Sequence, residues 1–280
     1  MPHTNGHRAS RPLSRRVLLW AGAAAIIGIP TAIILTETTH PAPLAATPPA
    51  PTRSAQPNIT PTATKTPTPT PAPFDAAHFS IDDPTSLWFV VNKHRPIPGA
   101  PTFTPPHLAP IPPEMLNPFG HQLRQETIAA LTIMFAAAKT QIGVTLVAES
   151  GYRSYDNQTS AYHSYVDTLG VEGADQTSAR PGYSEHQTGL AIDILDTISG
   201  CGTDGDCLGN TATGRWLANN AHTYGFLLRY QADKTSITGY EYEPWHFRFI
   251  GTLLAGHLHD VGIDTLEEFF NLPPAPTYTN

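Results

Sequence analysis

Several classes of side chain are missing from long parts of this 280-residue sequence. No basic stripe follows the N-terminal region and the formal net charge is −7, which argues against a nucleic-acid partner. Residues 41–73 contain no aromatic side chain and are nearly all Pro, Thr and Ala, so they cannot bury a hydrophobic core. No internal repeat is present, which argues against a solenoid or a repeat array.

Residues 1–16 lack acidic side chains but contain four arginines, and residues 17–35 carry no charge. An uncharged stretch of that length can just span a hydrocarbon core of about 30 Å, and its basic side is expected to stay in the cytoplasm. We therefore predict a basic cytoplasmic tail over 1–16 and a signal anchor or transmembrane helix over 17–36. A cleaved secretory signal is the alternative, and "SRRVLL" partly resembles a twin-arginine export signal. Each interpretation places the rest of the chain outside the cytoplasm.

The Pro/Thr/Ala-rich stretch is predicted to be an extended, disordered spacer with a reach of about 100 Å, at about 3.1 Å per residue. It either tethers a domain that works away from the membrane or is a passive tail. Folded sequence is expected to begin near Phe74. The predicted organisation after the anchor is a spacer over 37–76, a folded domain over 77–272 and a C-terminal tail over 273–280.

The sequence has only two cysteines, Cys201 and Cys207, within "CGTDGDC". In an exported protein such a close pair indicates a disulfide, which contributes about 2 kcal/mol in the loop-entropy model. A metal site is the rival interpretation, but a closed zinc site of this type needs a second pair of ligands nearby. We therefore predict the disulfide.

Apolar periodicity predicts a mixture of helices and strands. Apolar residues recur at helical spacing over residues 121–143, and this helix is expected to end at Gly143. Ser154 has the position of an N-cap for a helix to about Thr168, with Gln158 on its inward face beside aromatic residues. The other expected elements are strands at 144–150, 190–195, 226–230 and 245–250, a helix at 213–223, and a strand or buried extended segment at 87–93. Because helices and strands do not alternate regularly, the predicted class is α+β, with helices packed on a small antiparallel central sheet.

One of these strands carries a carboxylate, Asp193, among apolar residues. Burying an unpaired carboxylate costs several kcal/mol, so Asp193 needs a partner. His186 precedes this strand. Further on, Pro244 limits ladder pairing, which places Glu243 just before a strand and His246 at its start.

Two imidazoles and one carboxylate form the three-ligand set typical of a catalytic zinc site with one position open for water. The remaining carboxylate would then take a proton from that water and return it to a leaving group. The residues alone also allow Asp193 to pair with an arginine, and most of the 13 histidines have no ligand role.

Four motifs resemble those of one enzyme family. "SEHQTGLAID" (184–193) and "EPWHFR" (243–248) are similar to the two signature motifs of the VanY-type D-alanyl-D-alanine carboxypeptidases. These belong to a wider group of zinc peptidases that includes D-Ala-D-Ala dipeptidases and lysostaphin-like endopeptidases. "SGYRSYDNQ" (150–158) resembles the upstream motif, and "VVNKHRPI" (90–97) resembles the opening segment of the family. The similarity covers about residues 85–260 in family order, and the cysteine loop looks like a local insertion.

The resemblance implies a zinc site in a cleft on the sheet, with one Zn²⁺ per chain. His186, Asp193 and His246 would be its ligands. Glu243 would be the general base that activates water and the general acid that protonates the leaving amine. None of these catalytic positions is missing from the sequence, so an inactive homologue is not expected.

The resemblance also implies a set of substrate-binding residues. Arg153 would lie at the pocket and polarise the scissile carbonyl or stabilise its oxyanion, a role that suits a guanidinium group. Gln158 and Ser184 would help to hold the terminal D-Ala through its carboxylate.

The function implied by the resemblance is removal of the C-terminal D-Ala from peptidoglycan stem peptides by a zinc carboxypeptidase. The N-terminal segment predicts in addition that this enzyme is anchored to the membrane outside the cytoplasm, and we expect its catalytic domain to be monomeric. An L,D-carboxypeptidase or a peptidoglycan endopeptidase would use the same residues. A non-catalytic cell-wall-binding domain would not need Glu243, and a structural zinc domain would need a fourth protein ligand, whereas we find only three.

Overall fold

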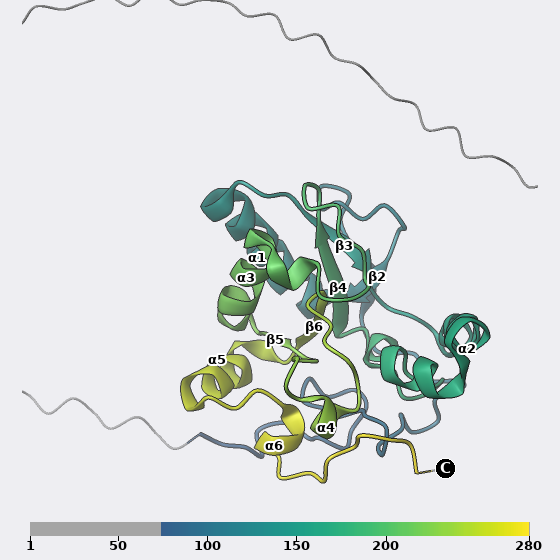
Figure 1. Cartoon of the computed structure of the whole chain (residues 1–280). Helices are drawn as coiled ribbons and strands as arrows, with labels where there is room; N and C mark the ends of the chain where they lie inside the picture. The colour runs from purple at the N-terminus through teal and green to yellow at the C-terminus, as the bar shows by residue number, and fades with distance from the viewer. Residues whose placement is uncertain (1–73, 280) are drawn as a thin grey trace, which may run out of the picture. The chain divides into compact units, whose positions relative to one another are not determined.

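The computed structural model of the chain describes residues 74–279 (Figure 1). The predicted basic tail, the predicted anchor over 17–36 and nearly all of the predicted spacer lie outside these residues. Within 74–279, no helix has both the length and the apolar character needed to cross a bilayer.

A four-stranded antiparallel sheet lies at the centre of the domain, with the strand order β3-β4-β6-β5. Its strands are β3 (Leu146–Ser150), β4 (Ala191–Asp196), β5 (Phe226–Leu228) and β6 (His246–Phe249). A separate two-stranded ladder pairs β1 (Leu108–Pro110) with β2 (Gln122–Arg124). The antiparallel sheet with helices packed on it confirms the predicted α+β class.

Helices flank the central sheet, with α1 and α3 on one side and α2 on the other (Figure 1). The α-helices are α1 (Gln125–Ile142), α2 (Tyr155–Thr177), α3 (Ala212–Asn220), α4 (Thr235–Thr238), α5 (Gly251–Val261) and α6 (Leu266–Phe269). Three short 3-10 helices are η1 (Glu185–Thr188), η2 (Leu208–Asn210) and η3 (Ala221–Tyr224). The main hydrophobic core joins α1, α3 and the sheet through buried residues such as Leu131, Leu217 and Phe247.

The two long helices begin and end for local reasons. α1 ends where Gly143 adopts the left-handed conformation (φ 70°), as its sequence predicts. α2 begins after Ser154, whose side chain accepts the backbone N–H three residues on at 3.2 Å. The predicted end of this helix, Thr168, lies just before a kink at Gly170 (φ 73°), beyond which the helix resumes to Thr177.

Residues 88–93 are buried and Leu87 is half-buried, but the segment belongs to no strand among the residues described. Their side chains alternate between two clusters. Trp88 and Val90 contact α5 and α6, whereas Phe89 and Val91 form a separate cluster. The segment is therefore the buried extended alternative of the sequence prediction.

Candidate metal centre and active site

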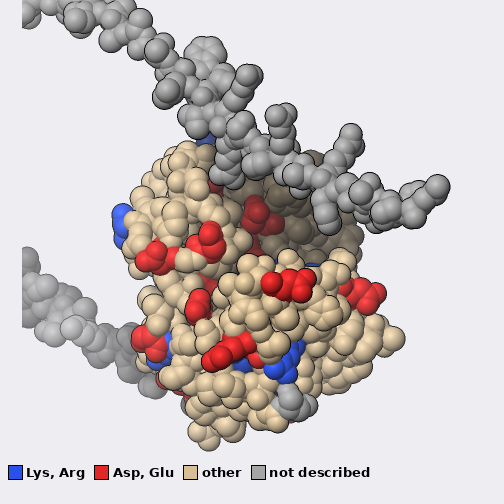
Figure 2. Space-filling model, turned by 45° about the vertical axis from the view of Figure 1, so that its right-hand side comes forward, with Lys and Arg blue, Asp and Glu red and all other residues tan. Residues whose placement is uncertain are grey.

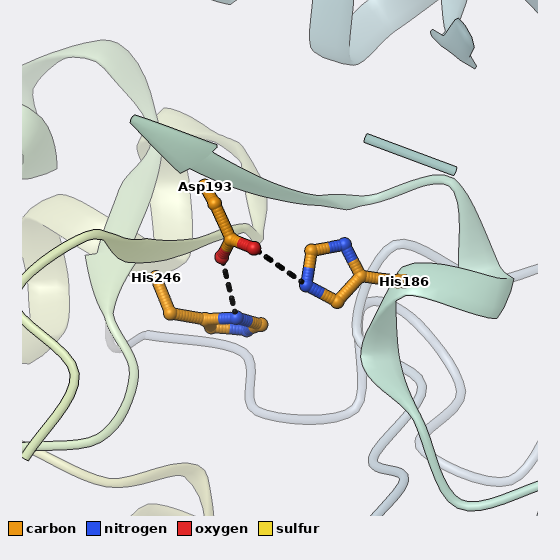
Figure 3. A group of neighbouring side chains, drawn as sticks. All are labelled: His186, Asp193 and His246. Carbon is orange, nitrogen blue, oxygen red and sulfur yellow. Dashed lines mark ion pairs between the residues drawn. The ribbon is translucent and has the colours of Figure 1, made fainter. Parts of the chain in front are cut away.

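Three side chains from different elements converge on one face of the sheet (Figure 3). Asp193 of β4 and His246 of β6 are directly opposite in the antiparallel ladder, so their side chains point to the same face. His186 comes from η1, which leads into β4 through Gly189 in the left-handed conformation (φ 68°). The order of the strands therefore brings together residues 60 positions apart.

Asp193 lies between the two imidazoles. Its Oδ2 is 3.4 Å from His186 Nε2, and its Oδ1 is 3.2 Å from His246 Nδ1. One nitrogen from each histidine and one aspartate oxygen lie within 4.8 Å of one another, and all three residues are buried. Asp193 Oδ1 makes no hydrogen bond although it is buried. A cation held here would satisfy this oxygen.

The outer nitrogen of each imidazole has its own hydrogen-bond acceptor. His186 Nδ1 is 2.8 Å from the carbonyl oxygen of Gly151, and His246 Nε2 is 3.1 Å from Glu185 Oε2. If each outer nitrogen carries the proton, the lone pairs of His186 Nε2 and His246 Nδ1 face Asp193. This is the arrangement in which histidines bind a metal.

The charge of the group also suits a cation. Burial opposes ionisation of Asp193, but the two imidazoles lower the pKa of its carboxyl group below the usual range. Burial likewise opposes protonation of His246, but the carboxylates of Asp193 and Glu185 raise its pKa to about 9. These carboxylates hold a proton on His246 in the metal-free protein, and a metal ion would replace it.

Glu243 lies next to this group without being part of it. Its Oε2 is 3.7 Å from His246 Nδ1, and its backbone N–H donates to the carbonyl of Tyr230 at 3.0 Å. Its side chain is 12% exposed. Burial raises the pKa of Glu243 to about 8, which suits a carboxyl group that both accepts and donates a proton near neutral pH.

A pocket of about 160 Å³ opens beside these residues, and its wall includes Glu243, Arg153 and Ser184. On the face drawn in Figure 2, a hollow opens among acidic side chains. Arg153 donates from Nη1 to Gln158 Oε1 at 2.9 Å and from Nη2 to Ser150 Oγ at 3.1 Å. Gln158 is only 1% exposed and lies behind Arg153 rather than in the pocket wall.

A fully buried ionic network, which the sequence analysis missed, lies behind His246. Glu185 Oε1 accepts hydrogen bonds from Arg229 Nε at 2.9 Å and Arg248 Nη1 at 3.0 Å. Arg229 also forms a forked pair with Glu267 at 2.9 and 2.8 Å, and the side chains of all four of these charged residues are fully buried. Charged residues in apolar strands were the available signal, because "FLLRY" and "WHFRFI" each contain one arginine.

The two cysteines lie close to the pocket. Cys201 and Cys207 form a disulfide with an S–S distance of 2.06 Å, as the sequence predicts. Thr203, inside the disulfide loop, lines the pocket. Cys201 also packs against a cluster that contains Trp245, a second residue of the pocket wall. The loop thus forms part of the rim of the site.

Comparison with known proteins supports the same family. The family model VanY, described as D-alanyl-D-alanine carboxypeptidase, matches residues 120–252. The protein YodJ of Bacillus subtilis (strain 168) is 40% identical over 196 residues, covering 68% of this chain and 69% of YodJ. The chain belongs to the VanY family of D-alanyl-D-alanine carboxypeptidases.

Two solved structures show how similar the folds are. The LdcB LD-carboxypeptidase has a TM-score of 0.60 at 41% identity, over 67% of this chain and 87% of LdcB. A variant of the vancomycin-resistance D,D-pentapeptidase VanY in complex with Zn(II) has a TM-score of 0.53 at 31% identity, over 65% of this chain and 98% of that protein.

Proposed function

We propose that this protein is a zinc carboxypeptidase that removes the C-terminal D-Ala from peptidoglycan stem peptides. The observation that carries the proposal is the buried group of His186, Asp193 and His246, with Glu243 beside it in one pocket. Three protein ligands are typical of a catalytic zinc site. A homologous VanY structure is a complex with Zn(II), which supports the same metal here.

A zinc ion held by these three residues supplies the Lewis acid that polarises water and the scissile carbonyl. Glu243 takes the proton from the attacking water as the new C–O bond forms. The same carboxyl group then gives this proton to the departing amine of D-Ala as the C–N bond breaks.

The pocket wall would hold the peptide in place. Arg153 is oriented by Gln158 and Ser150, so its guanidinium group is fixed where it would donate to the carbonyl oxygen and stabilise the oxyanion. Ser184 lines the same pocket and would bind the terminal carboxylate. Gln158 would act on the substrate through Arg153, because it lies outside the pocket wall.

Cleavage of the L,D bond of a tetrapeptide is the second candidate. It is favoured by the likeness to the LdcB LD-carboxypeptidase, which is 41% identical to this chain, against 31% for the VanY D,D-pentapeptidase. The metal group and Glu243 would serve both reactions. The two reactions differ in the residue that precedes the scissile bond.

We also propose that the domain works outside the cytoplasm. Its proposed substrate is a cell-wall peptide, and the Cys201–Cys207 disulfide fits an oxidising compartment. The proposed membrane anchor over 17–36 would hold the domain there.

The test uses the whole chain loaded with zinc, with synthetic pentapeptide and tetrapeptide stems, and identifies the products by mass. We expect loss of one D-Ala from the pentapeptide, whereas trimming of the tetrapeptide alone would select the L,D reaction. Glu243→Ala should keep its zinc but lose about 10²- to 10⁴-fold in kcat, and His186→Ala should lose both zinc and turnover. Near-normal kcat in Glu243→Ala, or no cleavage of either peptide by the unsubstituted chain, would refute the proposal.

A further inference from the structure

Residues 275–278 lie beyond the region matched by the family model, yet they pack against the domain next to the pocket. The backbone N–H of Ala275 donates to the carbonyl of Ile237 at 2.7 Å. Gly239 follows and has φ +83°, and a Cβ there would lie 2.6 Å from the carbonyl oxygen of Ala275. Glycine is therefore required at this position, both by its conformation and by the close approach of the segment.

Lys93, from the motif "VVNKHRPI", anchors this segment. Its side chain is almost fully buried, and Nζ donates to the carbonyls of Gly239 and of Pro276, the latter at 3.3 Å. The same ammonium lies 4.5 Å from the ring centre of Tyr240 and 5.5 Å from that of Tyr278. Because Tyr240 lines the pocket, Lys93 ties the segment to the pocket wall.

Tyr278 contacts residues on two sides, Arg180 and Tyr240. Its hydroxyl oxygen accepts the backbone N–H of Arg180 at 2.8 Å and lies 3.2 Å from the hydroxyl of Tyr240. The guanidinium group of Arg180 lies 4.3 Å from the centre of the Tyr278 ring and is paired with Asp175. The ring and the hydroxyl of Tyr278 thus hold the same residue.

The N–H of Arg180 belongs to the same peptide unit as the carbonyl of Ala179. That carbonyl accepts a hydrogen bond from Gln158 Nε2 at 2.7 Å, and Gln158 Oε1 accepts from Arg153 Nη1 at 2.9 Å. One peptide unit is therefore held on its N–H side by Tyr278 and on its carbonyl side by the residue that orients Arg153. Ala179 itself lines the pocket.

We propose that Tyr278 is a positioning residue for the substrate wall of the pocket. By fixing the orientation of the 179–180 peptide unit, it keeps Gln158, and through it Arg153, directed toward the peptide. The inference rests on the proposed function of the pocket. No metal ligand takes part in this chain of hydrogen bonds, so the effect falls on the contacts of Arg153 with the peptide and its oxyanion and leaves metal binding unchanged.

The test compares Tyr278→Phe, in the whole zinc-loaded chain, with the unsubstituted protein. The substitution removes the hydroxyl but keeps the ring beneath Arg180 and Lys93. Exchange of the Arg180 amide hydrogen, followed by NMR, should accelerate about 2- to 10-fold, because one hydrogen bond is lost. kcat/KM for the stem peptide should fall about 3- to 10-fold, because Arg153 would contact the carbonyl oxygen and its oxyanion but keeps its second anchor, Ser150. Zinc content should not change.

Tyr224→Phe is the matched control, because it removes a hydroxyl from a half-buried tyrosine outside the pocket wall, and it should change neither quantity. Tyr278→Ala, which also removes the ring, should lower kcat/KM further than Tyr278→Phe. An unchanged Arg180 exchange rate or an unchanged kcat/KM in Tyr278→Phe would overturn the inference. No turnover by the unsubstituted chain would instead overturn the proposed function, and amide exchange does not depend on turnover.

Discussion

Replacing Glu185 with glutamine removes one negative charge from a network in which two buried carboxylates balance two buried guanidinium groups. Glu185 Oε1 accepts from Arg229 and Arg248, and its Oε2 faces His246 Nε2 at 3.1 Å. Burial opposes ionisation of Glu185, but the two arginines keep its pKa well below the usual range. Both oxygens of the native Glu185 carboxylate therefore accept hydrogen bonds. A glutamine amide has only one acceptor oxygen, and its NH₂ group is a donor.

The glutamine amide can lie in two orientations, and in each of them its NH₂ group faces another hydrogen-bond donor. If its oxygen faces Arg229 and Arg248, its NH₂ group faces His246 Nε2, and that nitrogen must then give up its proton. The proton would move to Nδ1, the atom that faces Asp193, and would block a metal there. If the amide is reversed, its NH₂ group points at two guanidinium donors. Either outcome disturbs the metal centre or the network.

The expected loss of stability depends on which partners Arg229 and Arg248 keep when the Glu185 carboxylate is removed. Arg229 keeps its forked pair with Glu267, but Arg248 has no other carboxylate partner among residues 74–279. Removing one partner of a buried ion pair typically costs about 3–5 kcal/mol. We expect about 3 kcal/mol for Glu185→Gln, because the backbone carbonyl of Phe89 still accepts from Arg248 at 2.8 Å. A domain with about 5–15 kcal/mol of stability would still fold.

The assay measures zinc affinity by competition with a chelator, unfolding of the metal-free protein by urea, and the tautomer of His246 by NMR. Zinc binding should weaken about 10- to 100-fold, as is typical when a group that orients a ligand is lost. Glu267→Gln is the matched control, because it breaks a pair with Arg229 without touching His246. It should lose stability but keep the zinc affinity. Unchanged zinc affinity in Glu185→Gln would refute the reasoning, as would equal losses in both variants.

Two further predictions concern stability. Replacing Cys201 and Cys207 with serine should cost about 2 kcal/mol, which lowers Tm by about 4–8 °C in a domain of this size, and mass spectrometry should find no free thiol in the native protein. The rings of His222 and His259 stack at 3.6 Å, and burial together with His259 lowers the pKa of His222. Its stability contribution is therefore present above the unfolded pKa of about 6.5 and is lost as pH falls through the lower folded value. Tm measured between pH 5 and 8 should show this acid loss, and His222→Gln should reduce it, whereas an equal pH dependence in both proteins would contradict the assignment.

The metal group was the most predictable part of the site. A carboxylate on an apolar strand needs a partner, but this argument left an arginine partner open for Asp193, and the resemblance to the VanY-type motifs selected His186 and His246. The same argument applies to Arg229 and Arg248, which also interrupt apolar strands, but their partners could not be predicted. Glu185 lies in a short 3-10 helix and Glu267 in the four-residue helix α6, and neither has a periodic pattern that fixes its direction.

For residues 87–93 the sequence could not distinguish a strand from a buried extended segment, and the structure shows the reason. The apolar side chains of this segment alternate as in a strand. Two of its backbone carbonyls, however, accept hydrogen bonds from arginine side chains and not from a neighbouring strand. Arg248 Nη2 donates to the carbonyl of Phe89 at 2.8 Å, and Arg95 Nε donates to the carbonyl of Val90 at 2.9 Å. A buried backbone carbonyl needs a donor, but periodicity does not say whether that donor is a strand or a side chain.

The buried network connects several elements of the fold to the imidazole of His246. Replacing buried ion pairs with apolar residues of similar volume is often neutral or stabilising, so stability alone does not explain four buried charges behind one histidine. Through Glu185, the network joins η1, β6, α6 and Arg229, the residue after β5, at the imidazole of His246, and Arg248 extends it to Phe89. A turn of the His246 ring would break its contact with Glu185. The network therefore keeps a carboxylate acceptor at Nε2 of His246, the nitrogen that faces away from Asp193.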